Sequence, residues 1–191
     1  MKKFVVWSLA CVLIFATGCG SAPKSNRVSS TTASKASSSE ISSSTVENDT
    51  IPGIAAADIK LNLKKWIPEA KVQNVGSGVT YQSSATDSET GIEMTYAING
   101  HSPSEITGVT FNCVNLKNVE KSTYISFATG FLSMCATLPY TGAEQQNASQ
   151  WVKDNIEKVT TGSPSTTTIG GVTFQLSGGP NARSLEISKA K

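Results

Sequence analysis

The chain has 191 residues, with sixteen Lys and Arg against fourteen Asp and Glu, so its formal net charge is +2. Lys2 and Lys3 account for this excess, and the neutral remainder lacks the positive charge typical of a nucleic-acid-binding or polybasic membrane-surface protein. One histidine and four cysteines leave little material for a metal site or a catalytic triad. Composition therefore predicts no nucleic-acid partner, no metal and no cofactor.

The first eighteen residues have the pattern of a secretory signal peptide. Lys2 and Lys3 precede a stretch, residues 4–17, whose only polar members are Ser8 and Thr17. As a helix this stretch would be about 21 Å long, shorter than a hydrocarbon core of about 30 Å. We therefore expect an export signal at residues 1–18 rather than a permanent membrane-spanning helix.

The sequence Ala16-Thr17-Gly18-Cys19 resembles the lipobox of bacterial lipoproteins, with Ala16 in the place where leucine is common. The resemblance implies cleavage between Gly18 and Cys19, attachment of a diacylglyceryl group to the Cys19 sulfur, and a palmitate-labelled chain anchored on the extracytoplasmic face of the cell membrane. Two acyl chains hold a protein at a membrane stably, whereas one does so only marginally. The alternative is an ordinary signal peptide followed by an incidental cysteine.

Residues 19–50 have the composition of a flexible tether between this cysteine and a folded domain. From Gly20 to Thr50 there are eleven serines, four threonines and only three apolar residues larger than alanine. Such a segment buries too little surface to offset the entropy lost on ordering. We expect a spacer about 30 Å in end-to-end distance, followed by one globular domain at residues 51–191.

The first half of this domain predicts a helix and then strands. Ile59, Leu63, Trp66 and Ile67 repeat at helical spacing over residues 55–67, and Pro68 ends the helix, with Trp66 as a core anchor. Strict alternation predicts strands around Tyr81, over residues 92–98 and over residues 106–114. Residues 87–91 and the pair Asn99-Gly100 have the composition of the intervening turns.

The second half predicts two helices and a hairpin. Asn118 is a candidate N-cap for a helix that ends before Pro139, and a surface helix follows over residues 143–159. Residues 122–143 carry no charge, which favours a helix covered on several sides, the alternative being a second membrane segment. After a polar loop, residues 172–176 and 185–187 form the last hairpin. Gly-Val-Thr-Phe occurs at 108–111 and 171–174, through duplication or coincidence.

This order predicts an α+β fold, a single antiparallel sheet of about five strands with two to three helices packed on one face. The alternation of apolar and polar residues predicts that the other face of the sheet is exposed to solvent, either as a contact surface or as an ordinary solvated face. The residues expected on it are Thr80, Gln82, Thr95, Thr110, Asn112, Thr173 and Gln175.

Two cysteines remain in the domain, Cys113 on the apolar side of a strand and Cys135 on the apolar stripe of the following helix. Both are expected to face the same core. Outside the cytoplasm they form a candidate disulfide that would stabilise the fold by roughly 3 kcal/mol in the chain-entropy model. The alternative is a pair of buried free thiols acting as small apolar side chains.

Motifs for catalysis are missing from the sequence. His101, the only histidine, lies in a predicted turn, and no serine has a Gly-x-Ser-x-Gly context. The leading hypothesis is therefore a membrane-anchored, non-enzymatic binding or interaction module of unknown ligand, a protein or a small molecule. The alternatives are a small cell-envelope hydrolase that uses carboxylates and a surface exclusion or inhibitor lipoprotein.

Overall fold

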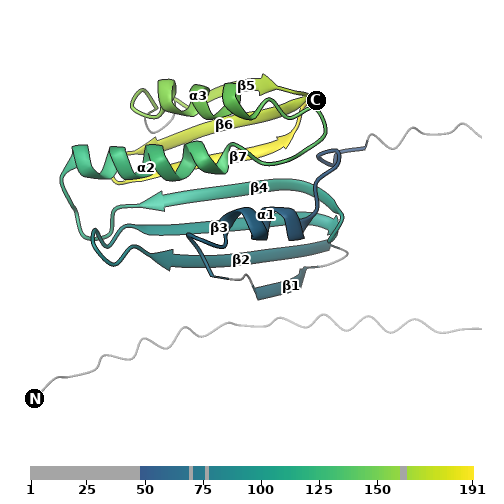
Figure 1. The fold of residues 1–191 in the computed structure, drawn as a ribbon, viewed down its shortest axis with the longest axis horizontal. Coiled ribbons are helices and arrows are strands. Elements are labelled where there is room, and N and C mark those ends of the chain that lie inside the picture. Colours follow the sequence, from purple (N-terminus) through teal and green to yellow (C-terminus); the bar gives the residue numbers. More distant parts are fainter. Residues whose placement is uncertain (1–47, 69–70, 76–77, 160–162) are drawn as a thin grey trace, which may run out of the picture. The chain divides into compact units, whose positions relative to one another are not determined.

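The computed structural model describes residues 48–68, 71–75, 78–159 and 163–191, and an antiparallel sheet lies at the centre of this part of the chain (Figure 1). Strand β1 (Lys71–Val75) pairs with β2 at one edge, which gives seven strands in the order β1-β2-β3-β4-β7-β6-β5. The other six strands are β2 (Gly78–Thr86), β3 (Glu93–Ser102), β4 (Glu105–Val114), β5 (Ser165–Ile169), β6 (Val172–Gly179) and β7 (Ala182–Lys189). The prediction of an α+β fold with one antiparallel sheet is confirmed.

The prediction of about five strands is wrong, because β1 and β5 were not recognised. Strand β5 reads Ser-Thr-Thr-Thr-Ile and pairs antiparallel with β6, from Ser165 opposite Leu176 to Ile169 opposite Val172. Its single large apolar residue gives no alternation of hydrophobicity for a sequence pattern to detect. An edge strand needs only one neighbour for its backbone hydrogen bonds, so this polar segment can still join the sheet.

Three helices contact the same face of the sheet: α1 (Ala56–Leu63), α2 (Lys121–Cys135) and α3 (Gln145–Asn155). Lys60 of α1 lies over the Tyr81 ring of β2, Tyr124 of α2 donates a hydrogen bond to a β4 carbonyl, and Trp151 of α3 packs on Phe174 of β6. Figure 1 shows the three helices on one side of the sheet, over its lower, middle and upper strands.

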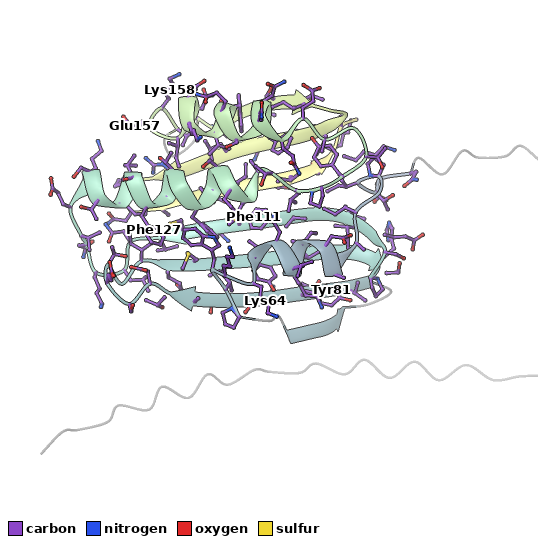
Figure 2. The ribbon with its side chains drawn as sticks, in the orientation of Figure 1. Lys64, Tyr81, Phe111, Phe127, Glu157 and Lys158 are labelled. Carbon is purple, nitrogen blue, oxygen red and sulfur yellow. The ribbon has the colours of Figure 1, made fainter. Side chains whose placement is uncertain are left out.

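The core lies between these helices and the inward side of the strands. Strand register aligns Tyr81, Ile98, Val109, Ile187 and Phe174 in one row across β2, β3, β4, β7 and β6, and all five are buried. Figure 2 shows Phe111 of the central strand β4 beneath the helix layer. Burial of this row and its neighbours is the main favourable contribution to folding, at roughly 25 cal/mol per Å² of apolar surface.

Each helix is shorter than predicted. Helix α1 ends at Leu63, and a turn carries the chain on to Ile67. Asn118 is not the N-cap of α2: its φ of 52° is left-handed, and Glu120 takes the cap position. Helix α3 begins at Gln145 and ends at Asn155. Within the described ranges, the structure contains no helix that is both long enough and apolar enough to cross a membrane.

Asn99 and Gly100 do not form the second predicted turn. They belong to β3, which continues to Ser102, and the register to β4 shifts on both sides of Gly100. A Cβ atom at Gly100 would lie 2.5 Å from the carbonyl oxygen of Glu105. A glycine is therefore required here because two backbones approach closely at a β-bulge. The dipeptide Asn-Gly is compatible with a bulge as well as with a turn, so the sequence alone did not distinguish them.

The two Gly-Val-Thr-Phe segments occupy positions that are not equivalent. Residues 108–111 lie in β4, the last strand of the first antiparallel meander, whereas Gly171 lies in the turn before β6 and residues 172–174 begin β6, the middle strand of the second. A simple duplication of one meander would place the repeat on corresponding strands, so the arrangement favours coincidence.

Candidate functional site

The face of the sheet opposite the helices is the candidate functional site, and we call it the open face. It is formed by the residues that alternate with the buried ones along β2, β3, β4, β7, β6 and β5. No helix of the described part of the chain lies on it (Figure 1). The seven residues predicted for the wet face all lie there, namely Thr80, Gln82, Thr95, Thr110, Asn112, Thr173 and Gln175.

Strand pairing arranges these side chains in rows that cross the sheet. One row runs through Gln82, Ala97, Thr110, Glu186, Gln175 and Thr166. A second row runs through Ser84, Thr95, Asn112, Ser184 and Ser177. Neighbouring strands are about 4.8 Å apart, so each row is a closely spaced series of mostly hydroxyl and amide groups, with Ala97 and the Glu186 carboxylate as the exceptions in the first row.

Side-chain hydrogen bonds order part of the open face. The Thr80 hydroxyl donates to Asn99 Oδ1 at 3.0 Å, and Asn112 Nδ2 donates to the Thr95 hydroxyl oxygen, also at 3.0 Å. Both pairs lie directly across neighbouring strands, which is the arrangement that stabilises sheets. These contacts orient the groups before any partner arrives.

The open face carries little charge. Glu186 is exposed near the middle of the face, between Thr110 and Gln175, and the other members of its row are uncharged. Sequence reasoning missed Glu186 and the threonines of β5; the alternation Arg183, Leu185, Ile187 could have placed Glu186 outward. This surface can donate and accept hydrogen bonds to a polar partner without desolvating many charges.

Cys113 and Cys135 are brought into one core, as predicted, and the structure has both as buried free thiols. Burial raises the pKa of Cys113 to about 12, and burial together with the neighbouring Cys113 raises that of Cys135. The thiolate is the reactive form, so both sulfurs are inert in the closed core. The disulfide stays a prediction, and it would have to form before the core closes.

The predicted lipid-attachment and cleavage residues, Cys19 and Gly18, lie outside the described residues. In the described part of the chain, no group of three or more His, Cys, Asp and Glu side chains is arranged to hold a metal ion.

His101 lies on β3 and not in a turn. Its Nε2 atom is 2.9 Å from Asp49 Oδ1, and both side chains are exposed. The hydrogen bond with His101 is the largest effect that lowers the pKa of Asp49. Lys189 donates to the carbonyl of Asn48 beside it. These contacts hold the start of the domain against the sheet, which is a structural role for the only histidine.

Trp66 is less buried than a core anchor. Its side chain is 38% exposed and packs edge-on against Phe127, with ring centres 6.3 Å apart, and at a tilt against Phe131 at 5.9 Å. One edge of the indole therefore belongs to the core and the other to the surface.

Arg183 is a buried cation that sequence reasoning missed. Its Nε donates to the carbonyl of Ile156 at 2.9 Å, and its Nη1 donates to the carbonyls of Gly179 and Ala182. Ile156 is the C-cap of α3, where a positive charge is favourable. A pocket of about 560 Å³ beside it also involves Lys121 and Glu157. Arg183 thus joins α3 to the β6–β7 hairpin.

Asp87 gives the domain a pH-dependent contribution to stability. Its Oδ2 accepts from the Thr90 hydroxyl at 2.7 Å and from the Thr90 amide at 2.8 Å, and these bonds lower its pKa below 3.8. A lowered carboxyl pKa stabilises the fold above the unfolded value and loses this effect as pH falls through the folded value. In urea unfolding, Asp87→Asn should therefore be less stable than the wild type near neutral pH. The two proteins should converge below the lowered pKa, and a gap that stays constant with pH would contradict this account.

No protein-family model matches the chain, and comparisons with curated proteins and with solved structures give no match either.

Proposed function

We propose that the chain is a lipid-anchored, extracytoplasmic lipoprotein whose domain is a non-enzymatic binding module, and that the open face is its contact surface. The Ala16-Thr17-Gly18-Cys19 sequence and the Ser/Thr-rich segment after it support the anchor. A diacylated Cys19 would hold the chain at the membrane, and residues 20–50 would give the domain freedom to reach a partner.

The observation that carries the binding proposal is the chemistry of the open face. Its rows of Ser, Thr, Asn and Gln lie on a sheet whose opposite side is covered by three helices, so the backbone beneath them is held firmly. Short hydroxyl side chains lose little rotamer freedom when a partner immobilises them. A rigid surface of this kind favours a neutral, polar ligand, such as a sugar or a peptide, bound by many individually weak hydrogen bonds.

Site-specific photocrosslinking in intact cells tests this proposal. A photoreactive amino acid replaces Gln175, which is exposed on β6, the second strand from the β5 edge, or Gln146, which is exposed on α3. We expect the Gln175 position to yield a discrete crosslinked species that is recovered after solubilisation of the envelope. The Gln146 position is the matched control and should not yield that species.

Substitution of Glu186 refines the result. Glu186→Gln keeps the side-chain shape at the middle of the open face and removes its charge, so the Gln175 adduct should persist if the ligand is neutral. Equal crosslinking from Gln175 and Gln146, or from neither, would show that the open face is an ordinary solvated surface.

A further inference from the structure

A patch of apolar and basic side chains lies at the C-terminal end of α1 and in the turn that follows it. We call it the α1 patch and define it as Leu61, Lys64, Lys65 and Trp66. Helix α1 buries Ala56, Ile59 and Leu63 against the core, and this leaves Leu61 on its outer side, 73% exposed. Lys64 lies just beyond the C-terminal end of the helix (Figure 2).

Positive charge is concentrated here although the domain is neutral. Residues 56–71 contain Lys60, Lys64, Lys65 and Lys71 against Asp58 and Glu69. The Asp58 carboxylate accepts a hydrogen bond from the Ala55 amide at 3.0 Å, at the opposite end of α1 from Lys64 and Lys65. A groove of about 460 Å³ runs along the helix, and its lining combines Ala57, Leu61, Ile67 and Pro68 with Lys60 and Lys64.

Trp66 gives this surface a fixed aromatic group. Phe127 and Phe131 of α2 pack against its ring and leave 38% of the side chain exposed. An indole held half in and half out of a core, in the same turn as the exposed Lys64 and Lys65, matches the residue types that occupy the boundary between lipid headgroups and acyl chains.

We propose that the α1 patch binds the anionic lipid headgroups of the membrane to which the chain is anchored. This inference rests on the proposed lipid anchor. The tether ends at about residue 50 and α1 begins at Ala56, so the chain enters the domain at the other end of this eight-residue helix, about 12 Å from the patch along its axis. Tethering would keep the local concentration of the membrane high. Each lysine near an anionic bilayer adds attraction, and Leu61 and Trp66 supply apolar contact.

Binding in this way would orient the domain. The helices contact one face of the sheet, and the outer side of α1 is directed away from that sheet (Figure 1). With the α1 patch on the bilayer, the open face would be directed away from the membrane and toward partners outside the cell. Membrane contact and partner binding would then use opposite sides of the domain.

Quenching of Trp66 fluorescence by brominated lipids tests the proposal in the full mature lipoprotein, reconstituted into phosphatidylcholine vesicles with or without phosphatidylglycerol. Trp151→Phe makes Trp66 the only indole after residue 18. We expect quenching in the phosphatidylglycerol vesicles, loss of this quenching at high salt, and little quenching in phosphatidylcholine alone. In the reciprocal Trp66→Phe protein the fluorescence comes from Trp151 of α3, and it should be quenched in neither type of vesicle.

Charge substitutions identify the surface. Lys64→Gln with Lys65→Gln should abolish the quenching, whereas Lys153→Gln with Lys158→Gln on and after α3 should leave it unchanged. The mature chain with Cys19→Ser, added from solution, separates this proposal from the anchor. It should still bind phosphatidylglycerol vesicles, and the paired substitutions at Lys64 and Lys65 should weaken that binding about thirtyfold. Quenching independent of phosphatidylglycerol, or protection of Trp66 by self-association of the chain, would overturn the proposal.

Discussion

Replacing Cys19 by serine is expected to abolish incorporation of radiolabelled palmitate into the chain. A serine hydroxyl does not take the place of the thiol that forms the thioether to diacylglycerol, so both acyl chains are lost together. Because each buried methylene contributes about 0.8 kcal/mol to membrane binding, this removes nearly all of the expected anchoring energy. Palmitate labelling followed by immunoprecipitation, with the intact mass of the product, measures the effect.

Cys11→Ser is the matched control for this experiment. Cys11 lies in the apolar part of the predicted signal peptide, eight residues before Cys19, and would be removed with it. Labelling should therefore match that of the wild type. If Cys19→Ser keeps its full palmitate label, the lipoprotein proposal is wrong, whatever the domain binds.

Replacing Phe111 by alanine is expected to destabilise the domain by about 3–5 kcal/mol. Phe111 is fully buried on β4, the fourth of seven strands, and it lies opposite Tyr96 on one side and Leu185 on the other. Truncation removes buried apolar surface and leaves a cavity where both halves of the sheet meet. Total stabilities of domains are about 5–15 kcal/mol, so this loss is a large fraction of the whole.

Thr110→Ala provides the comparison, because Thr110 is the preceding residue and points to the open face. Its effect should stay within about 0.5 kcal/mol. Chemical unfolding followed by the fluorescence of Trp66 and Trp151 measures both variants. Similar losses of unfolding free energy from the two substitutions would show that β4 does not have one buried face and one open face.

Alternating hydrophobicity predicted the strands that have one face in the core. Met94, Tyr96 and Ile98 of β3 are all buried, and the residues between them, Thr95 and Ala97, lie on the open face, as the pattern indicated. The same rule assigned the inward side of β4 and β7. It succeeded because a period of two leaves only one register that buries every apolar side chain.

The pattern failed where pairing, and not hydrophobicity, decides the structure. Thr166, Thr167 and Thr168 are in a strand because β6 offers an edge to which their backbone can bond. Gly100 is in a bulge because another segment of chain approaches it closely. Both facts depend on residues distant in sequence, which local propensity does not contain.

For the candidate site, sequence supplied the composition of the open face but not its extent. Thr110 and Gln175 were identified from their own strands, whereas the row that joins them through Glu186 exists only because β7 inserts between β4 and β6. The N-cap of α2 was misplaced because the backbone conformation of Asn118 could not be read from its residue type. Asn118 has a left-handed φ and lies in the connection before the helix, and Glu120 is the N-cap.

The insertion of β7 between β4 and β6 also sets the order in which the molecule can be completed. Residues 182–189 form the last of the described strands in sequence order, yet they occupy the fifth position of seven in the sheet. When a polypeptide emerges from a ribosome or a translocation channel with its N-terminus first, β4 and β6 present unpaired edges until residue 189 has followed. Loss of residues 182–189 would divide the sheet into two parts, each with an unpaired edge that favours aggregation. Until these residues have been synthesised, the chain is incompletely folded and open to quality-control proteases.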